Sequence, residues 1–233
     1  MVARVRPLRA TGTGKFVAIF QLVRGDTFGN VLKVGMDNTL AVAVADKPEG
    51  PYQWHGPLLC GGQPVQGSDT AVFTDDDGKQ YLISGHAGDQ GWNVSEWLYE
   101  LAPDCLSAVK EANLHTGGEA AALFKHDGVY FLLHSRLSGL QPNDNFYHTA
   151  TNIWGPWQGK GNLAQGDHSA KTFMTQTMDV IPVAGKNGAF IWIGDSIRGG
   201  MRPCNRTVWL PINFKNKGEM EIRWRDWWDL SDL

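Results

Sequence analysis

The chain has 233 residues, and its 21 Lys and Arg against 24 Asp and Glu give a net charge of only −3. This near balance would not steer the protein to phosphates, so a nucleic-acid-binding function is not expected. Hydrophobic residues make up 42% of the chain, yet no apolar run approaches the roughly 20 residues that a membrane-spanning helix needs, so no membrane span is predicted. The 10 Trp and 10 Phe suit an all-β protein with grooves lined by aromatic rings, although packing in a core is the commoner use of Trp.

The amino terminus, MVARVRPLR followed by FVAIFQLV, looks superficially like a secretory signal, because a basic start precedes a short apolar stretch. Arg24-Gly25-Asp26 follows directly, without a cleavage site of the A-x-A kind. No signal peptide is therefore predicted from these residues.

Four segments of the chain share one pattern, in which an apolar strand leads through a polar turn ending in Gly to a second strand rich in aromatic and β-branched residues. They read VRPLRATGTG-KFVAIF, DTAVFTDDDG-KQYLIS, EAAALFKHDG-VYFLLH and QTMDVIPVAG-KNGAFIWIG. Their turn glycines are Gly14, Gly78, Gly128 and Gly185. Turns of this kind between apolar runs predict β-hairpins.

A second element follows two of these hairpins. AVAVADKPEGPYQWHGPL and YHTATNIWGPWQGKG share a strand, a polar corner, a Gly-Pro-aromatic sequence and an outer strand. The other two units end with WLYEL near residue 100 and with VWLPINF and EIRW near the carboxyl terminus. No segment has a sustained apolar stripe at helical spacing, so long helices are not expected.

Four strands in roughly 50–60 residues, repeated along the chain, are typical of the blades of a β-propeller. The sequence therefore predicts an all-β fold and a single β-propeller domain over residues 1–233. Its four blades are expected at about 1–60, 61–112, 113–165 and 166–233. The alternative is a β-sandwich whose hairpins happen to look alike; the shared turn position and the recurring Gly-Pro corner favour the propeller.

The repeat also predicts a site, because the innermost strands of a propeller line one channel and equivalent positions on them form a ring. The residues nine positions before the turn glycines are Val5, Asp69, Glu119 and Gln176. Two carboxylates that converge in a pocket are what glycoside hydrolysis requires. Ordinary polar residues at the wet start of a strand would fit the same pattern, and the repeat alone does not separate these two interpretations.

Several stretches resemble glycoside hydrolase family 43, and within it the exo-β-1,3-galactanases. They are GSDTAVFTDDDGKQYLI, GEAAALFKHDGVYFLLHSRLSGLQPNDNFYHTATNIWGPW, TQTMDVIPV, FIWIGD, VWLPINF and EIRWRDWWDLSDL. The resemblance runs over residues 40–233, and the quoted stretches lie within this range from Gly67 onward. The resemblance implies a five-bladed propeller that hydrolyses terminal β-1,3-linked galactose with inversion.

The resemblance also implies roles for three residues. Glu119 matches the general acid, and Asp69 matches the carboxylate that orients this acid and tunes its pKa. Gln176 matches a Gln that faces the attacking water in the galactanase-like group, in place of an Asp base. Because an amide is not a usable base at neutral pH, Gln176 is expected to position the water.

Further candidates concern the substrate. Gly139 matches a backbone position that lines the galactose subsite, and Ser138, Asn143 and Trp92 are additional candidate substrate-binding residues. Asn143 and Asn145 lie in the matching loop, where turn-forming residues that shape the loop are the favoured interpretation.

The chain departs from the family pattern in several places. It lacks the blade that precedes Arg6-Pro7 in the family, so it is expected to be truncated at the amino terminus. Val5 stands where the family has a Glu of the active site, and Leu140 stands where an aromatic residue is expected. Trp92 or Trp97 could supply a replacement platform for a sugar ring, with packing the favoured role for each.

These departures leave alternatives open beside the galactanase. One is a non-catalytic propeller that binds galactan, and another is a family 43 arabinofuranosidase or xylosidase. The expected partner is a β-1,3-galactan polysaccharide or oligosaccharide, with no cofactor and with the protein as a monomer. An extracellular location is expected from the resemblance alone.

Metal binding and disulfides are not predicted. The seven His are scattered without ligand spacing; His86 and His134 could line the pocket, although satisfied histidines at strand ends are the simpler interpretation. Asp75–Gly78 is interpreted as a hairpin turn rather than as a calcium loop. Three cysteines are too few for a disulfide framework and are expected to be unpaired. They are Cys60, Cys105 and Cys204.

Overall fold

A computed structural model describes residues 6–22, 39–87, 94–138, 141–196 and 206–233. The chain divides into two compact units, Met1–Asn113 and Leu114–Leu233, and each is described by itself. In the described ranges the regular structure is almost entirely β. The helical segments there are one short turn, α1 (Lys171–Met174), and one 3-10 turn, η1 (Leu230–Asp232).

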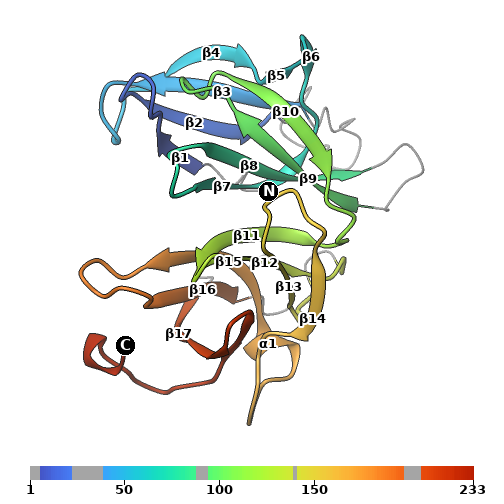
Figure 1. The fold of residues 1–233 in the computed structure, drawn as a ribbon, viewed down its shortest axis with the longest axis vertical. Helices are drawn as coiled ribbons and strands as arrows, with labels where there is room; N and C mark the ends of the chain where they lie inside the picture. The colour runs from blue at the N-terminus through green and yellow to red at the C-terminus, as the bar shows by residue number, and fades with distance from the viewer. Residues whose placement is uncertain (1–5, 23–38, 88–93, 139–140, 197–205) are drawn as a thin grey trace, which may run out of the picture. The chain divides into compact units, whose positions relative to one another are not determined.

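The first unit begins with a four-stranded antiparallel sheet in chain order (Figure 1). Its strands are β1 (Arg6–Arg9), β2 (Phe16–Gln21), β3 (Leu40–Ala45) and β4 (Gln53–Pro57). Val17 and Ile19 of β2 are fully buried in the core of this unit, whereas Ala18 points to the opposite face of the sheet. This alternation is the period of two that a strand imposes on its side chains.

The second sheet of this unit has six strands in the order β6-β5-β10-β9-β8-β7. The longer strands are β7 (Ser68–Thr74), β8 (Gln80–Ala87), β9 (Val94–Leu101) and β10 (Ser107–Asn113). The two extra strands, β5 (Leu59–Cys60) and β6 (Gln63–Pro64), form a short hairpin whose β5 pairs with β10 in parallel. Two-residue strands leave no periodic pattern, so this extension of the blade was not predictable from the repeat.

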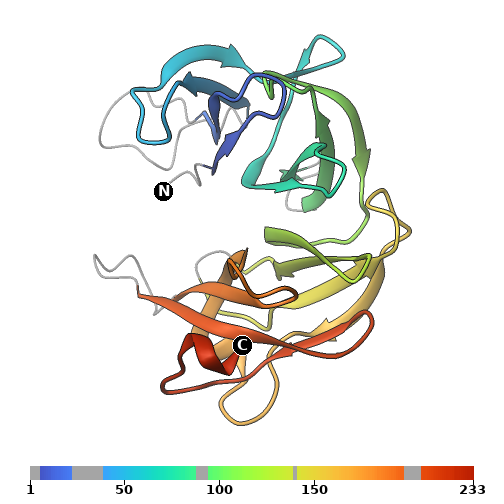
Figure 2. The same ribbon diagram turned by 60° about the vertical axis from the view of Figure 1, so that its left-hand side comes forward.

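The second unit holds two four-stranded antiparallel sheets, which Figure 2 shows from a second direction. The third sheet consists of β11 (Glu119–His126), β12 (Val129–Ser135), β13 (Phe146–Ala150) and β14 (Gln158–Asn162). The fourth consists of β15 (Thr175–Pro182), β16 (Phe190–Ser196), β17 (Thr207–Asn216) and β18 (Glu219–Ile222).

The four predicted hairpins are confirmed. They are β1-β2, β7-β8, β11-β12 and β15-β16, and each lies at one edge of its sheet. The backbone φ angles of the four turn glycines are +70° at Gly14, +82° at Gly78, +74° at Gly128 and +79° at Gly185. Side chains are disfavoured in this left-handed region, which explains why Gly recurs at the end of each turn.

The two Gly-Pro corners also occupy equivalent places. Gly50-Pro51 lies between β3 and β4, and Gly155-Pro156 lies between β13 and β14; both peptide bonds are cis. The chain therefore has the all-β fold with four propeller-type blades that the repeat predicts. The single-domain organisation and the predicted blade boundaries stay predictions.

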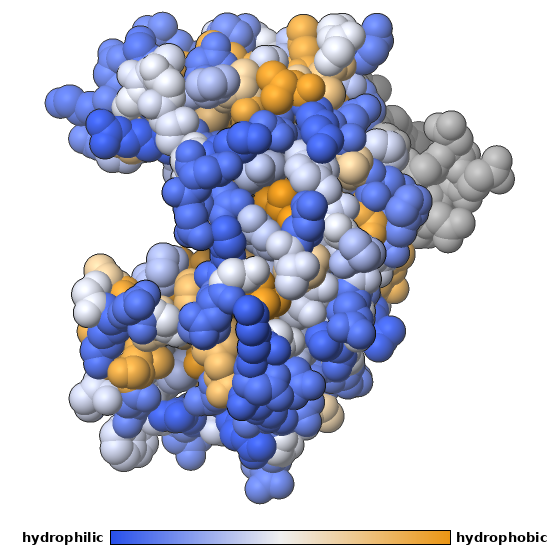
Figure 3. Space-filling model, in the orientation of Figure 1, coloured by the Kyte–Doolittle hydropathy of each residue, from blue (hydrophilic) through white to orange (hydrophobic). Residues whose placement is uncertain are grey.

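Each unit has its own apolar core. In the first unit, side chains from the first sheet, such as Leu8 and Ile19, pack with Leu82 and Tyr99 of the second sheet. In the second unit, a larger set of aromatic rings fills the space between the third and fourth sheets. It includes Phe124, Phe131, Tyr147, Phe190 and Trp192. On the face seen in Figure 3, hydrophilic residues cover most of the area and hydrophobic ones form separate patches.

A buried amide connects the two sheets of the first unit. Gln80 is 3% exposed; its Oε1 accepts the backbone N–H of Thr11 at 2.9 Å, and its Nε2 donates to the backbone oxygen of Arg9 at 2.9 Å. We expect Gln80→Met to lower the free energy of unfolding by about 1 to 3 kcal/mol, because the partly buried hydrogen bonds of Gln80 with the backbone of Arg9 and Thr11 are lost. Urea denaturation measures this loss, and Lys79→Met next to it is the control for an exposed position. An equal, small effect of both substitutions would contradict the prediction.

Glu221 on β18 is a buried carboxylate with two cationic partners. Arg223 and Lys215 donate to it, the latter at 2.7 Å. The hydrogen bond from Arg223 is the main reason why the pKa of Glu221 lies below its usual value, with Lys215 adding to the effect.

A lowered pKa means that Glu221 stabilises the fold above the pKa it has in the unfolded chain, and that this contribution is lost as the pH falls through the folded-state pKa. Glu221→Gln is therefore expected to lower Tm at pH 7, with a difference from the wild type that shrinks below about pH 4. Thermal unfolding between pH 2.5 and 7 tests this. A difference that stays constant over this range would show that the charge of Glu221 does not matter.

Candidate active site

Two strands of the second unit bring candidate catalytic residues together. β11 and β15 are the edge strands of the third and fourth sheets, and they lie side by side (Figure 1). Glu119 is the first residue of β11, and Gln176 is the second residue of β15. Both side chains are partly exposed, so both can meet a ligand from solvent.

The amide of Gln176 contacts Glu119 directly. Its Nε2 donates to Glu119 Oε1 at 3.1 Å and to Ser135 Oγ at 2.8 Å, and the Ser135 hydroxyl donates to the backbone oxygen of Glu119 at 3.3 Å. An amide nitrogen carries two N–H donors, and both are used here. The side-chain oxygen of Gln176 is therefore the atom of this amide that is left to accept a hydrogen bond from a water or a sugar hydroxyl.

Ser135 was not among the residues predicted from the sequence. It is fully buried at the end of β12, directly opposite Glu119 in the antiparallel ladder. Its contact with Gln176 spans 41 residues of sequence. The sequence signal was weak, because a Ser at the end of an apolar strand is ordinary and only the ladder register places it beside Glu119.

β-Bulges follow the candidate residues on both strands. The ladder shifts between Glu119 and Ala122 on β11 and between Thr177 and Asp179 on β15. A bulge adds one residue to one strand and re-aims the side chains beside it. On β11 the last ladder position before the shift is Glu119 opposite Ser135. On β15 it is Thr177 opposite Gly194, one position after Gln176, which pairs with Asp195.

Asp69 lies in the first unit, on β7, with a φ of +50° inside the bulge between Ser68 and Ala71. In the ladder it is Ser68, paired with Gly85, that occupies the position equivalent to Glu119. Counting nine residues back from the turn glycine therefore misses the equivalent position on β7 by one residue. The reason is the longer turn: five residues, Asp75–Lys79, separate β7 from β8, whereas two separate β11 from β12. The role that the resemblance implies for Asp69 stays a prediction.

The candidate substrate-binding residues are only partly described. Asn143 accepts the backbone N–H of Arg136 at 3.0 Å and donates to the Arg136 backbone oxygen at 2.7 Å and to Ser138 Oγ at 2.6 Å. Asn143 thus closes the loop between β12 and β13, and a contact of Asn143 or Ser138 with a sugar stays a prediction. Four positions lie outside the described residues. They are Val5, Trp92, Gly139 and Leu140.

His134 supports the segment that carries Glu119. It is fully buried, and its Nε2 lies 2.8 Å from Nδ1 of His148. A Cβ at Gly118 would lie 3.0 Å from the His134 ring, so the chain before Glu119 passes close to this ring. The side chain of His86 lies outside the described part of the structure.

No group of three or more His, Cys, Asp or Glu suited to a metal ion occurs among the described residues. Within the same ranges, no helix is long and apolar enough to cross a membrane. Cys60 and Cys105 are thiols, and burial raises the pKa of Cys105 to about 12. Cys204 lies outside the described residues.

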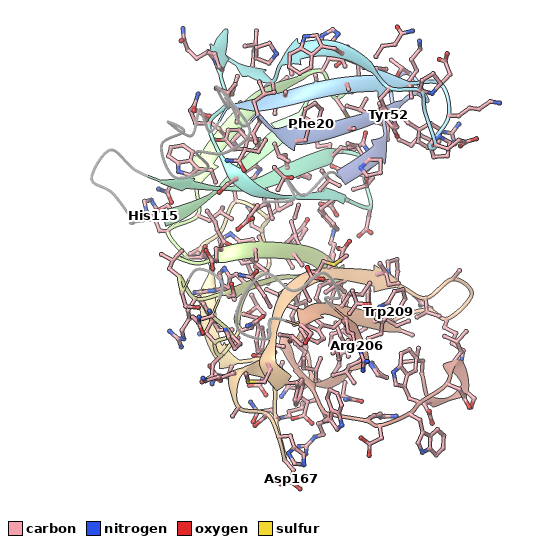
Figure 4. The ribbon with its side chains drawn as sticks, turned by 180° about the vertical axis from the view of Figure 1, so that it is seen from behind. Phe20, Tyr52, His115, Asp167, Arg206 and Trp209 are labelled. Carbon is pink, nitrogen blue, oxygen red and sulfur yellow. The ribbon has the colours of Figure 1, made fainter. Side chains whose placement is uncertain are left out.

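An aromatic hollow occurs on the first sheet of the first unit. It has a volume of about 470 Å³. Its lining includes the aromatic rings of Phe20 and Tyr52, which are labelled in Figure 4, and of Trp54, together with Ala18 and Ala43. Trp97, in contrast, packs against the core of the first unit.

The chain matches the model of glycosyl hydrolases family 43 over residues 10–211. Among solved structures, it is 26% identical to a GH43 β-1,3-galactosidase with galactodeoxynojirimycin, with a TM-score of 0.84, and the match covers 98% of this chain and 77% of that one. It is 27% identical to the exo-β-1,3-galactanase 1,3Gal43A from Clostridium thermocellum, with a TM-score of 0.75, and the match covers 94% of this chain and 49% of that one.

A curated relative points to other sugars. It is a xylosidase/arabinosidase from Butyrivibrio fibrisolvens, 30% identical over an alignment of 108 residues, and the match covers 40% of this chain. The match spans only 20% of the length of that relative. It therefore carries less weight for this chain than the similar structures, whose matches run over nearly all of it.

The all-β fold with four propeller-type blades places the chain in the class of β-propeller proteins. Within this class, the chain belongs to glycosyl hydrolases family 43.

Proposed function

We propose that this protein releases terminal galactose from β-1,3-galactan with inversion at the anomeric carbon. Glu119 gives a proton to the glycosidic oxygen, and Gln176 positions the attacking water through its side-chain oxygen. The proton that this water loses passes to solvent, from which Glu119 is protonated again. The observation that carries the proposal is the hydrogen-bonded group formed by Glu119, Gln176 and Ser135 on adjoining strands. The names of the similar structures supply the choice of galactose.

The geometry limits how such a reaction proceeds. In inverting glycosidases the acid and the group that activates water stand roughly 6.5–9.5 Å apart, which leaves room for sugar and water. Gln176 and Glu119 are in direct contact at 3.1 Å. A bound sugar would have to replace this hydrogen bond, while the contact of Gln176 with Ser135 keeps the amide in place.

This contact also indicates which of the two carboxyl oxygens of Glu119 carries the acidic proton. A protonated carboxyl group donates from one oxygen and accepts at the other. Since Oε1 accepts from Gln176, the acidic proton belongs on Oε2. In this proposal Gln176 donates a hydrogen bond to Glu119 before the sugar binds. After the sugar has bound, it positions the attacking water.

The test is incubation with β-1,3-galactobiose and β-1,3-galactotriose, with the products followed by proton NMR. We expect galactose whose first-formed anomer is α, because inversion of a β linkage gives the α product. A β anomer formed first would contradict the inverting mechanism. Absence of galactose release, together with calorimetric binding of the oligosaccharide, would select the non-catalytic galactan-binding alternative.

A different sugar is favoured by one observation, the similarity to the xylosidase/arabinosidase. Aryl β-xyloside and aryl α-arabinofuranoside, assayed beside aryl β-galactoside, separate these substrates. Faster release from either of the first two would replace galactose by a pentose in the proposal. For a polysaccharide substrate we further propose an extracellular place of action and a monomeric enzyme.

A further inference from the structure

We propose that Asn145 is a positioning residue that fixes Gln176 against Glu119 and Ser135; this inference rests on the proposed function. Asn145 is fully buried in the loop that leads into β13. Its Oδ1 accepts the backbone N–H of Thr177 at 2.6 Å, and its Nδ2 donates to the backbone oxygen of Thr175 at 3.3 Å. The amide of Asn145 thus grips the two residues on either side of Gln176.

The Asn145 amide makes the hydrogen bonds that a neighbouring strand would otherwise make with β15. β15 is an edge strand, and on one side it pairs with β16. Alternate residues of an edge strand turn their N–H and C=O groups away from the sheet, and these groups need partners when they are buried. Thr175 and Thr177 are fully buried, and the Asn145 amide supplies an acceptor and a donor to them as a strand backbone would.

Asn145 is itself held at both ends. Its Nδ2 also donates to the backbone oxygen of Asn143 at 3.1 Å, and its backbone N–H donates to Thr172 Oγ1 at 2.8 Å. Its Oδ1 accepts a second hydrogen bond, from Thr177 Oγ1 at 2.8 Å. The side-chain amide is therefore fully used, and its orientation is fixed.

The segment before Gln176 needs such a restraint. Lys171, Thr172, Phe173 and Met174 all have left-handed φ angles, between +47° and +62°. Left-handed backbone costs roughly 1–2 kcal/mol per residue with a side chain, and it persists where the surroundings impose it. The Asn145 side chain holds Thr175 and Thr177, directly after this segment. Its loss would leave only the backbone bond of Asn145 to Thr172, so the end of the segment could relax and move the Gln176 amide.

The effect on catalysis should be specific to the step in which Gln176 acts. A displacement of about 1 Å in a positioned group can lower the rate by about 10²-fold. We therefore expect Asn145→Ala to lower kcat on β-1,3-galactobiose by about 10- to 100-fold, with less than a threefold change in KM. Asn145→Asp keeps the oxygen that binds Thr177 and loses the N–H that binds Thr175, so it serves as a second variant if the Ala variant does not fold.

The matched control is Tyr147→Phe. Tyr147 lies on β13 in the same unit, is 4% exposed, and accepts the backbone N–H of Met220 through its hydroxyl at 3.2 Å. Its substitution removes a buried hydrogen bond as well, but away from Gln176. A merely structural role of Asn145 would make both variants similar in Tm and in kcat.

A double-mutant cycle with Gln176→Ala decides whether Asn145 acts through Gln176. We expect the double variant to be no slower than Gln176→Ala alone. A further loss of kcat by the same factor as in the wild-type background would overturn the proposal.

The hydrogen bonds of the Asn145 amide with Thr175 and Thr177, called the clamp below, can also be tested without turnover. In spectra of ¹⁵N-labelled protein, the side-chain amide signals of Gln176 should shift or broaden in Asn145→Ala and stay unchanged in Tyr147→Phe. If the wild type releases no galactose but this difference is seen, the proposed function fails and the clamp stands. Unchanged Gln176 signals in Asn145→Ala would refute the clamp whatever the activity.

Discussion

Replacement of Glu119 by Gln is expected to lower kcat on β-1,3-galactobiose by about 10²- to 10⁴-fold, the usual contribution of a general acid. The amide has nearly the same shape as the carboxyl group but has no acidic proton to give to the leaving oxygen. Its side-chain oxygen can still accept the N–H of Gln176, as Glu119 Oε1 does at 3.1 Å. The fold and the position of Gln176 should therefore be preserved, and Tm should change little.

A substrate with a good leaving group isolates the proton transfer. Dinitrophenyl β-galactoside needs little protonation, so Glu119→Gln should hydrolyse it far closer to the wild-type rate than it hydrolyses galactobiose. Glu219→Gln is the matched control, because it makes the same change at an exposed carboxylate of the same unit, bonded to Asn216 at 2.8 Å. Full activity of Glu119→Gln on galactobiose would mean that another group is the acid.

The hairpins and corners of the fold could be predicted because they depend on local chemistry. A turn glycine such as Gly128 is required by a positive φ at that point, whatever the rest of the chain does. The β5-β6 hairpin could not be predicted in the same way. It is held by a parallel pairing of Leu59 and Cys60 with Ser107 and Ala108, and such distant pairing leaves no signal in a two-residue strand.

The candidate site was predictable in its residue types but not in its contacts. Glu119 and Gln176 stand out as polar residues at the start of apolar strands, which the repeat aligns. Their hydrogen bond depends on which strands become neighbours and on the ladder register, and no local pattern encodes these. Asn145 shows the same limit: its residue type suggests a loop former, whereas its amide reaches residues 30 and 32 positions away.

Replacement of Trp192 by Ala is expected to lower the free energy of unfolding by about 3 to 5 kcal/mol, the range for loss of a large aromatic side chain from a core. Trp192 is fully buried between the sheets of the second unit, and its Nε1 donates to Thr177 Oγ1 at 3.2 Å. Gly194 leaves room for the ring, since a Cβ there would lie 2.2 Å from it. The surroundings thus fit the indole closely.

The control for this substitution is Trp227→Ala, because Trp227 is 81% exposed. Its effect should stay within about 0.5 kcal/mol, as is usual at the surface. Denaturant unfolding measures both variants, and similar losses would show that burial does not govern the effect. Trp192→Phe keeps most of the apolar volume but removes the hydrogen bond from Trp192 Nε1 to Thr177 Oγ1. Because the volume is largely kept, this variant should lose less stability than Trp192→Ala. It should still disturb the strand that carries Gln176, because Thr177 also binds Asn145.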